Sequence, residues 1–250
     1  MDADLPTAQA DFEARLAARD LCLFTVKSQT KPEDKTSLLA IQDLVRAERP
    51  GYRYLEVGSH LGGTLTPHLT DRRCSAAISI DARPASQPDI RARDYDYPDN
   101  SSARMIELIR ESAPDADLRK LAVFDSDAAE VRDVGASVDL VFIDGEHTVT
   151  AVFRDFLNTW RWAAPSAVVA FHDSNLIFDG LLNIEALLAS QGVGCDAFFL
   201  PLNVFVLATG DFRAPAREQL SPLAYDRAAF LDASQQALWD EIAASRRAAG

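Results

Sequence analysis

Cysteine is scarce in this sequence, and the few that occur are widely separated. The 250 residues include three cysteines, Cys22, Cys74 and Cys195. Three such distant thiols are too few for a disulfide framework or a zinc cluster. Their apolar neighbours favour small buried side chains in a reducing compartment.

Basic residues are also in short supply. The chain has 25 lysines and arginines against 38 aspartates and glutamates, which gives a formal net charge of −13. Proteins that bind nucleic acid or anionic lipid use clustered basic side chains to attract the phosphates. The acidic balance therefore argues against nucleic-acid and membrane partners.

Long apolar runs are missing as well. No stretch approaches the roughly 18 apolar residues that a membrane-spanning helix needs. The acidic N-terminal region lacks the basic and apolar parts of a secretory signal, so we expect a cytoplasmic protein. The composition, 48% hydrophobic and 25% charged, is that of a globular chain. We expect a single domain with a helical or lid segment over residues 1–50, a core over 51–210 and a helical extension over 211–250.

Short apolar runs alternate with helical patterns along most of the chain. Runs such as LVFI and AVVAF are typical of strands buried on both faces, as in a parallel sheet covered by helices. The expected strands are Tyr52–Val57, Ala76–Asp81, Leu121–Phe124, Val138–Ile143 and Ala167–Phe171. Between them we expect helices over Leu61–Thr70, Ser101–Glu111, Ala128–Val134 and Thr148–Trp162.

The last third of the chain has a different pattern. The runs DAFFL and NVFVLA are separated only by Pro201 and Leu202. So short a connection permits only an antiparallel hairpin. The sequence therefore predicts an α/β fold with five parallel strands and an antiparallel pair at one edge. Further helices are expected over Lys31–Glu48, Leu181–Ser190 and Tyr225–Ala249.

The first strand runs into a glycine-containing loop, YLEVGSHLGG. Gly58 allows a sharp turn after the strand, and two later glycines allow close approach of a ligand or helix. A nicotinamide enzyme is one reading, but His60 replaces the middle glycine of the dinucleotide fingerprint. Glu56 would also repel a pyrophosphate. A nicotinamide-dependent oxidoreductase therefore remains only as an alternative.

The next two strands also end in acidic residues. Ligands of open parallel sheets bind beyond the carboxyl ends of the strands, where Asp81 is placed to accept hydrogen bonds from ribose hydroxyls. Asp125 and Ser126 follow the third strand, where their polar groups can contact the edge of an adenine. Equally, Ser126 or Asp127 can cap the next helix.

A denser group follows strands four and five. Asp144, Glu146 and His147 follow one strand, and His172 and Asp173 end the next. Adjacent strands lie about 4.8 Å apart, so groups at their ends can converge on one ion. Two carboxylates with an imidazole suit Mg²⁺, Mn²⁺ or a similar divalent metal. The alternative is that these acids merely line a cofactor pocket.

Five segments in this order carry a resemblance to a known family: YLEVGSHLGG, ISIDARP, VFDSD, VDLVFIDGEHTVTAVFRDF and VVAFHDSN. They resemble the class I S-adenosylmethionine-dependent methyltransferases, in particular the macrocin and mycinamicin sugar O-methyltransferases (methyltransferase domain 24-like). The resemblance covers about Lys27 to Ala208, and IDGEH followed by FHD is its more specific part. It implies a Rossmann-like, doubly wound seven-stranded sheet with helices on both faces and a reversed last strand.

The resemblance also implies roles for individual residues. The methionine part of S-adenosylmethionine would lie against Glu56, Gly58, Ser59 and Gly63. The ribose would lie against Asp81, and the adenine against Asp125 and Ser126. Asp144 would also line the cofactor pocket. In the resembling enzymes the acids at positions 144, 172 and 173 bind Mg²⁺. Here His172 replaces one acid, which implies a site of Asp144, His172 and Asp173 whose metal preference has shifted or whose metal has been lost.

The expected reaction is methylation of a hydroxyl on a small molecule or glycoside. The acceptor oxygen must lose its proton and be shielded from water, and a metal that binds it would help. His147, with an unperturbed pKa of about 6.5, is suited to be the base, a role that the resemblance supports. The alternatives are that His147 packs or caps a helix, and that the chain is a non-catalytic cofactor-binding module.

Two polar stretches are candidates for contact with the substrates. DYDYPDNSSARM follows the second strand and is expected to form a wall of the acceptor pocket. FTVKSQTKPEDK precedes the first strand and is expected to fold over the cofactor as a lid, with Lys27 or Lys35 near its carboxylate. The terminal helices are candidate interface elements for a homo-oligomer.

Overall fold

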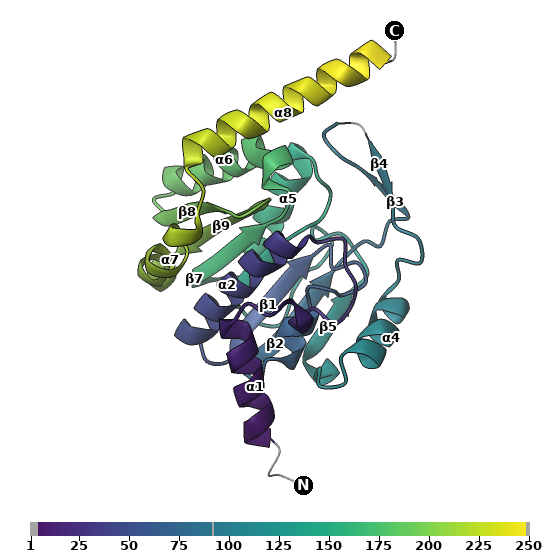
Figure 1. Cartoon of the computed structure of the whole chain (residues 1–250), viewed down its shortest axis with the longest axis vertical. Coiled ribbons are helices and arrows are strands. Elements are labelled where there is room, and N and C mark those ends of the chain that lie inside the picture. Colours follow the sequence, from purple (N-terminus) through teal and green to yellow (C-terminus); the bar gives the residue numbers. More distant parts are fainter. Residues whose placement is uncertain (1–4, 92, 249–250) are drawn as a thin grey trace.

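A seven-stranded sheet forms the centre of the computed structural model, which describes residues 5–91 and 93–248 (Figure 1). Its strands, in spatial order, are β5 (Leu121–Phe124), β2 (Cys74–Ile80), β1 (Tyr52–Val57), β6 (Val138–Ile143), β7 (Ala163–Phe171), β9 (Val204–Thr209) and β8 (Cys195–Leu200). The first five are parallel, and β9 runs antiparallel to both of its neighbours. The predicted fold class is therefore confirmed.

Helices cover both faces of the sheet, because successive strand residues point to opposite sides. One apolar cluster joins one face of the sheet to α2 (Pro32–Glu48), α3 (Thr66–Thr70), α4 (Ser102–Ser112) and α7 (Arg213–Gln219). The other cluster joins the opposite face to α5 (Val149–Trp160), α6 (Ser174–Ser190) and the start of α8 (Arg227–Ala248). The sheet is thus buried on both sides, as its apolar runs predicted.

The N-terminal helix α1 (Leu5–Ala17) packs on α2 through Phe12 and Leu16, which contact Leu39. Short 3₁₀ turns complete the chain at Leu21–Leu23, Leu118–Lys120, Gly210–Phe212 and Ser221–Leu223. Residues 1–4 of the expected N-terminal segment and residues 249–250 of the expected extension lie outside the described residues. Among the described helices, none is both long and apolar enough to span a membrane.

One predicted helix, Ala128–Val134, is wrong. The chain forms a turn and an irregular stretch there, although Ala128, Val131 and Val134 are buried as a helix face would be. The carbonyls of Ala128 and Val131 accept hydrogen bonds from the guanidinium of Arg161, a residue distant in sequence. In a helix these carbonyls would accept hydrogen bonds from backbone N–H groups, and here the guanidinium donates to them instead.

Two helices begin well away from the expected residue. Helix α3 begins at Thr66 rather than at Leu61, because Gly62 adopts a φ of +82° in a turn before it. Helix α6 begins at Ser174, well before Leu181. Between β2 and α4 the chain forms a short hairpin that the sequence analysis did not predict, β3 (Ser86–Pro88) and β4 (Asp94–Asp96), of which β4 lies in the polar stretch DYDYPDNSSARM.

Phe171 gives a direct test of the core beneath the site. Its side chain is fully buried, with ring centroids 6.2 Å from Phe156 and 6.0 Å from Phe205. We expect Phe171→Ala to lower the free energy of unfolding by about 3–5 kcal/mol, since it leaves a cavity between packed rings. Leu157 of α5 is 46% exposed, so Leu157→Ala should change the free energy of unfolding by less than about 0.5 kcal/mol. Urea titrations measure both variants.

Candidate active site

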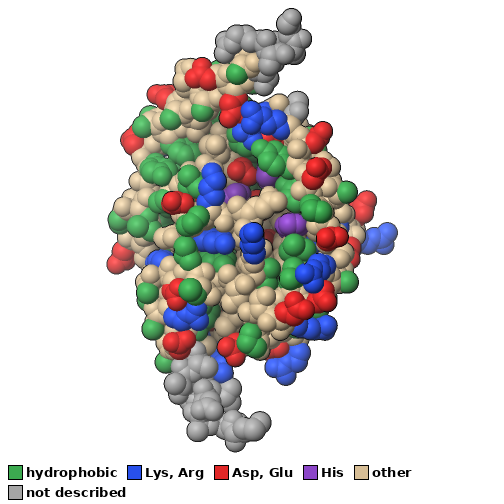
Figure 2. Space-filling view, turned by 45° about the vertical axis from the view of Figure 1, so that its right-hand side comes forward, with side chains coloured by type: hydrophobic (Ala, Val, Ile, Leu, Met, Phe, Trp, Pro, Cys, Tyr) green, Lys and Arg blue, Asp and Glu red, His purple; other side chains and the backbone are tan. Residues whose placement is uncertain are grey.

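A cavity of about 370 Å³ opens at the carboxyl edge of the parallel strands. It is bordered by the segment before α2, by the loop after β1, by the ends of β2, β6 and β7, and by the β3–β4 hairpin. Figure 2 shows this face of the molecule hollowed, with histidine and acidic side chains gathered in the hollow. The cavity lies where open α/β sheets bind their ligands.

The loop after β1 can pass close to β6 because Gly58 has no side chain. Gly58 has a φ of +83°, and a Cβ there would lie 2.0 Å from the backbone oxygen of Asp144. Gly63 is equally confined, since a Cβ there would lie 2.5 Å from the Cβ of Ser28. Gly58, Ser59 and Gly63 all line the cavity, as expected for residues near a cofactor.

Glu56, predicted near the methionine part of the cofactor, lies under the loop after β1. Its side chain is fully buried beneath the loop, and Glu56 is not among the described residues that line the cavity. The hydroxyls of Tyr54 and Thr64 donate hydrogen bonds to its carboxylate. Burial is the main cause that raises the pKa of Glu56 to about 7. The structure thus places Glu56 as a support under the loop.

Asp81 is held rigidly at the end of β2. The backbone N–H of His60 donates to one carboxylate oxygen at 2.8 Å, and that of Arg83 donates to the other at 2.7 Å. Asp81 lines the cavity and is almost fully buried. Each carboxylate oxygen retains further acceptor capacity, so Asp81 can still receive the hydroxyls of a ribose.

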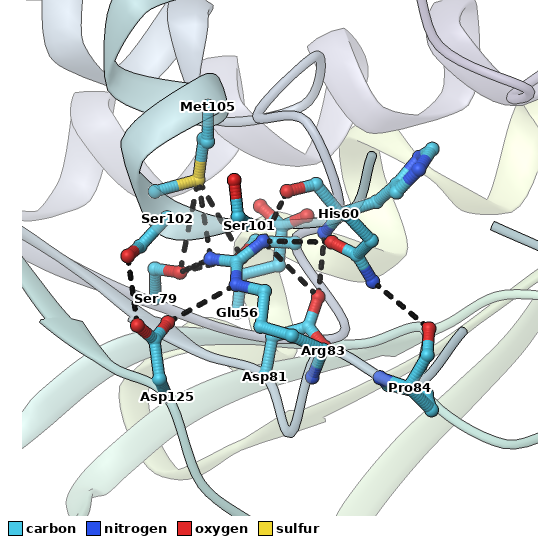
Figure 3. A network of polar contacts seen from close by, with 12 residues as sticks. Glu56, His60, Ser79, Asp81, Arg83, Pro84, Ser101, Ser102, Met105 and Asp125 are labelled. Carbon is cyan, nitrogen blue, oxygen red and sulfur yellow. Dashed lines mark hydrogen bonds and ion pairs between the residues drawn. The ribbon is translucent and has the colours of Figure 1, made fainter. Parts of the chain in front are cut away.

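The residues expected at the adenine lie apart from this cavity. Asp125 and Ser126 are not among the described residues that line it. Asp125 instead accepts a hydrogen bond from Ser102 at 2.7 Å and one from Arg83 at 3.2 Å. No sequence pattern marked Arg83, which Figure 3 shows at the centre of this network.

Two histidines and two aspartates converge at the ends of β6 and β7. The Nε2 atom of His147 lies 3.1 Å from Oδ2 of Asp173 and 3.7 Å from Oδ1 of Asp144. The Nδ1 atom of His172 lies 3.1 Å from Asp144 Oδ1 and 3.2 Å from Asp173 Oδ2. One ligand atom each from Asp144, His147 and Asp173 falls within 4.8 Å of the others. The sequence prediction that these strand ends converge is confirmed in the geometry.

Asp34, from the first turn of α2, completes this cluster. Its carboxylate is buried and lies 3.2 Å from His172 Nε2, and it also accepts the backbone N–H of Asn203 at 2.9 Å. The local sequence marks Asp34 only as an acidic residue in the first turn of a helix. Its partners are distant along the chain, so no local pattern indicated that it belongs to the site.

The electrostatic balance favours charged forms in this cluster. Burial alone would raise the pKa of Asp144, but His172 and His147 outweigh it and lower that pKa to about 2. Burial also lowers the pKa of each imidazole, and the surrounding carboxylates reverse this. They hold the pKa of His147 above 6.5 and that of His172 well above it. His147 does not cap the following helix, because Thr148 accepts the N–H of Ala151 in that role.

The far wall of the cavity is the β3–β4 hairpin, joined to both His147 and α8. The backbone N–H of Ile90 donates to the carbonyl of His147 at 3.0 Å, and the Tyr95 ring meets the imidazole edge-on at 6.5 Å. Arg91 pairs with Asp89 and with Glu241 of α8. From the polar stretch DYDYPDNSSARM, Tyr95, Tyr97 and Asn100 line the cavity.

Three buried polar atoms around the cavity have no hydrogen-bond partner among the described residues. They are Ser28 Oγ, His60 Nε2 and Asn175 Oδ1, and all three residues line the cavity. Buried polar atoms are normally paired. These atoms are therefore available to a ligand, and Ser28 belongs to the segment expected to cover the cofactor.

The contact between the β1 loop and β6 can be tested with a pair of glycines. Gly58→Ala should lower the free energy of unfolding by about 3 kcal/mol or more and abolish cofactor binding, because the new Cβ collides with backbone. Gly135 has a similar φ of +85°, but no described atom lies within 4 Å of an added Cβ. Gly135→Ala should cost only about 1–2 kcal/mol from backbone strain and leave binding intact. Urea unfolding and calorimetric titration with S-adenosylhomocysteine measure both.

Comparisons with known proteins agree with this geometry. Residues 55–174 match the model of a methyltransferase domain family. CalS11, a calicheamicin methyltransferase, has a similar structure, with a TM-score of 0.54 at 14% identity over 84% of this chain and 95% of its own. A Klebsiella pneumoniae protein designated an O-methyltransferase superimposes with a TM-score of 0.51 at 11% identity over 79% of this chain and 89% of its own.

At these identities the two structures establish a shared fold. No protein of curated function matches the sequence. The family match covers β1 to the start of α6, the segment that contains the glycine loop, Asp81 and the aspartate–histidine cluster. The match over residues 55–174 is thus to a methyltransferase domain, in agreement with the class I, S-adenosylmethionine-dependent methyltransferase that the sequence predicted.

Proposed function

We propose that this protein transfers the methyl group of S-adenosylmethionine to a hydroxyl oxygen of a small molecule or glycoside. The observation that carries the proposal is the cluster of Asp144, His147, His172 and Asp173 in the same cavity as the glycine loop and Asp81. A methyl donor bound along the loop would place its sulfonium beside these groups. They can activate an oxygen that reacts there.

The transfer makes simple demands on the protein. The acceptor oxygen must be deprotonated, aligned with the methyl group and protected from water. His147 is the group we assign to the proton. Asp173, 3.1 Å from its Nε2 atom, orients the ring and stabilises the imidazolium that forms when the proton arrives.

The same cluster has the donor set for a divalent cation. Asp144 and Asp173 have ligand atoms within 4.8 Å of each other and of an imidazole nitrogen of His147. The Nδ1 atom of His172 also lies 3.1 Å and 3.2 Å from these two carboxylates, and two carboxylates with an imidazole fit Mg²⁺, Mn²⁺ or a similar ion. We propose that Asp144, His172 and Asp173 hold such an ion. When bound, it would lower the pKa of an acceptor hydroxyl and orient the oxygen.

The two histidines differ in a way that supports this division of roles. His172 has its Nε2 atom against the buried carboxylate of Asp34, so its Nδ1 atom is directed to the aspartate pair. A carboxylate on the far nitrogen is the usual arrangement of a metal-bound histidine. His147 is more exposed, at 22% against 13%, and faces the acceptor wall through Tyr95. It is therefore the better candidate for the base.

The rival readings are less well supported. The match of residues 55–174 to a methyltransferase domain favours methyl transfer over a nicotinamide-dependent oxidation. A non-catalytic binding module would have no use for a base and an acid pair beside the cofactor. Turnover on a panel of hydroxylated acceptors separates that reading from ours, since a binding module would bind S-adenosylhomocysteine and methylate nothing.

Removal of the base should change the pH profile as well as the rate. The neutral imidazole is the active form, and the carboxylates hold the pKa of His147 above 6.5, so wild-type turnover should rise with pH through a value above 6.5. His147→Asn should lower kcat by about 10²–10⁴-fold and abolish that rise. Rates from pH 5.5 to 9 test this. An unchanged profile in the variant would remove His147 from the role of base.

The metal can be tested independently through Asp173. A chelator should suppress wild-type turnover, and added Mg²⁺ or Mn²⁺ should restore it. Asp173→Asn should lower turnover at least about tenfold and weaken metal binding in calorimetric titrations, whereas Asp115→Asn, at an exposed position far from the cavity, should behave as wild type. Full turnover of the wild type in chelator would contradict the metal site and leave methyl transfer itself standing.

A further inference from the structure

Arg83 is an unusual arginine, because its guanidinium is buried beside the predicted cofactor site. Only 7% of its side chain is exposed. Its Nη2 atom donates to the hydroxyls of Ser59 at 3.4 Å and Ser79 at 3.2 Å, and its Nη1 atom donates to the carbonyl of His60. The same guanidinium lies 3.4 Å from the carboxylate of Asp81. One side chain thus contacts the glycine loop, the interior of β2 and the end of β2 (Figure 3).

The other side of the guanidinium reaches two further segments. Its Nε atom donates to Asp125 after β5 at 3.2 Å, and Nη1 donates to Asn100 before α4 at 3.3 Å. Met105 of α4 contributes its sulfur at 3.4 Å. Ser102, at the start of α4, donates to the second oxygen of Asp125. Each oxygen of Asp125 therefore accepts one hydrogen bond within the network around Arg83.

The backbone around Asp81 is held in an unfavourable form by the same contacts. His60 and Arg83 have φ values of +45° and +54°, and their N–H groups are the two donors to Asp81. Non-glycine residues in the left-handed region cost free energy and persist only where surrounding contacts fix them. The bond from Arg83 to the His60 carbonyl joins these two strained residues directly. Arg83 is therefore in a position to fix the geometry of Asp81 from both sides.

We propose that Arg83 is a positioning residue for the cofactor. It locks the glycine loop and Asp81 into the form that receives the ribose, and Asp125 serves as its counter-ion rather than as an adenine contact. The proposal rests on the proposed function only in taking S-adenosylmethionine as the ligand. Without Arg83, the Asp81 and Asp125 carboxylates would lose the cation between them, and the loop would lose its tie to β2 and α4.

The experiment is a double-mutant cycle on binding of S-adenosylhomocysteine, measured by calorimetry. Arg83→Met should weaken binding about tenfold or more, a factor that corresponds to the loss of one hydrogen bond to a charged group. Asp125→Asn should weaken it in the same direction, and the double variant should bind no worse than Arg83→Met, because both changes break one unit. Arg104→Met, in an exposed pair with Glu107, is the matched control and should bind as wild type.

A second ligand separates positioning from direct contact. S-inosylhomocysteine lacks the amino group of adenine, so a residue that accepts from that group would distinguish it from S-adenosylhomocysteine. Under the proposal, Asp125→Asn weakens both ligands by the same factor. The proposal would be overturned if Asp125→Asn no longer distinguished S-adenosylhomocysteine from S-inosylhomocysteine. It would also be overturned by strictly additive effects in the double-mutant cycle, or by tighter binding of S-adenosylhomocysteine to Arg83→Met. If the wild type binds neither ligand, the proposed function fails instead.

Thermal unfolding of the ligand-free variants completes the test. Arg83 also ties together several segments, so Arg83→Met is expected to lose some stability. Titration well below its unfolding temperature keeps the binding result interpretable, and Asp125→Asn, at a half-exposed carboxylate, provides the milder variant. In methyl-transfer assays of Arg83→Met, we expect the KM for S-adenosylmethionine to rise while kcat at saturating cofactor stays within about twofold of wild type. This split is the result expected of a residue that positions the cofactor.

Discussion

The close approach of Gly58 to the backbone of Asp144 is the contact on which the site depends. It brings the loop after β1 against the end of β6, with no room for a side chain between them. The loop supplies one half of the cavity, and the strand end supplies the acid that begins the aspartate–histidine cluster. The glycine loop and the aspartate–histidine cluster therefore line one cavity because the two backbones approach so closely.

The charges of the site are organised around that contact in two groups. On one side, Arg83 lies between Asp81 and Asp125 and keeps their carboxylates apart. On the other side, His147 and His172 alternate with the Asp144 and Asp173 carboxylates. In the second group each imidazole lies between two acids, so the pKa values of Asp144 and Asp173 are lowered although burial alone would raise them. Glu56, with no cation beside it, shows the opposite behaviour, and its pKa rises to about 7.

Much of the fold follows from local patterns in the sequence. The strands Tyr52–Val57, Leu121–Phe124 and Val138–Ile143 begin and end at the predicted residues, since apolar runs and turn residues mark them directly. The helix predicted over Ala128–Val134 fails because Arg161 takes its carbonyls. Asp34 was not recognised because His172 stands 138 positions away, and such a pairing exists only after folding. The acidic residues could be located from the sequence because they follow predicted strands. The residues that fix their orientation come from segments remote in the sequence.

The short hairpin beside His147 is supported differently from the other walls of the cavity. Its strands have three residues each, too few to hold a shape without outside support. That support comes at the turn between them, where Ile90 donates to the His147 carbonyl and Arg91 pairs with Glu241 on the C-terminal helix. The glycine-loop side of the cavity is built into the sheet, whereas the hairpin wall is joined to the His147 segment and to the C-terminal helix. A change in α8 can therefore displace this wall without a change in the core of the sheet.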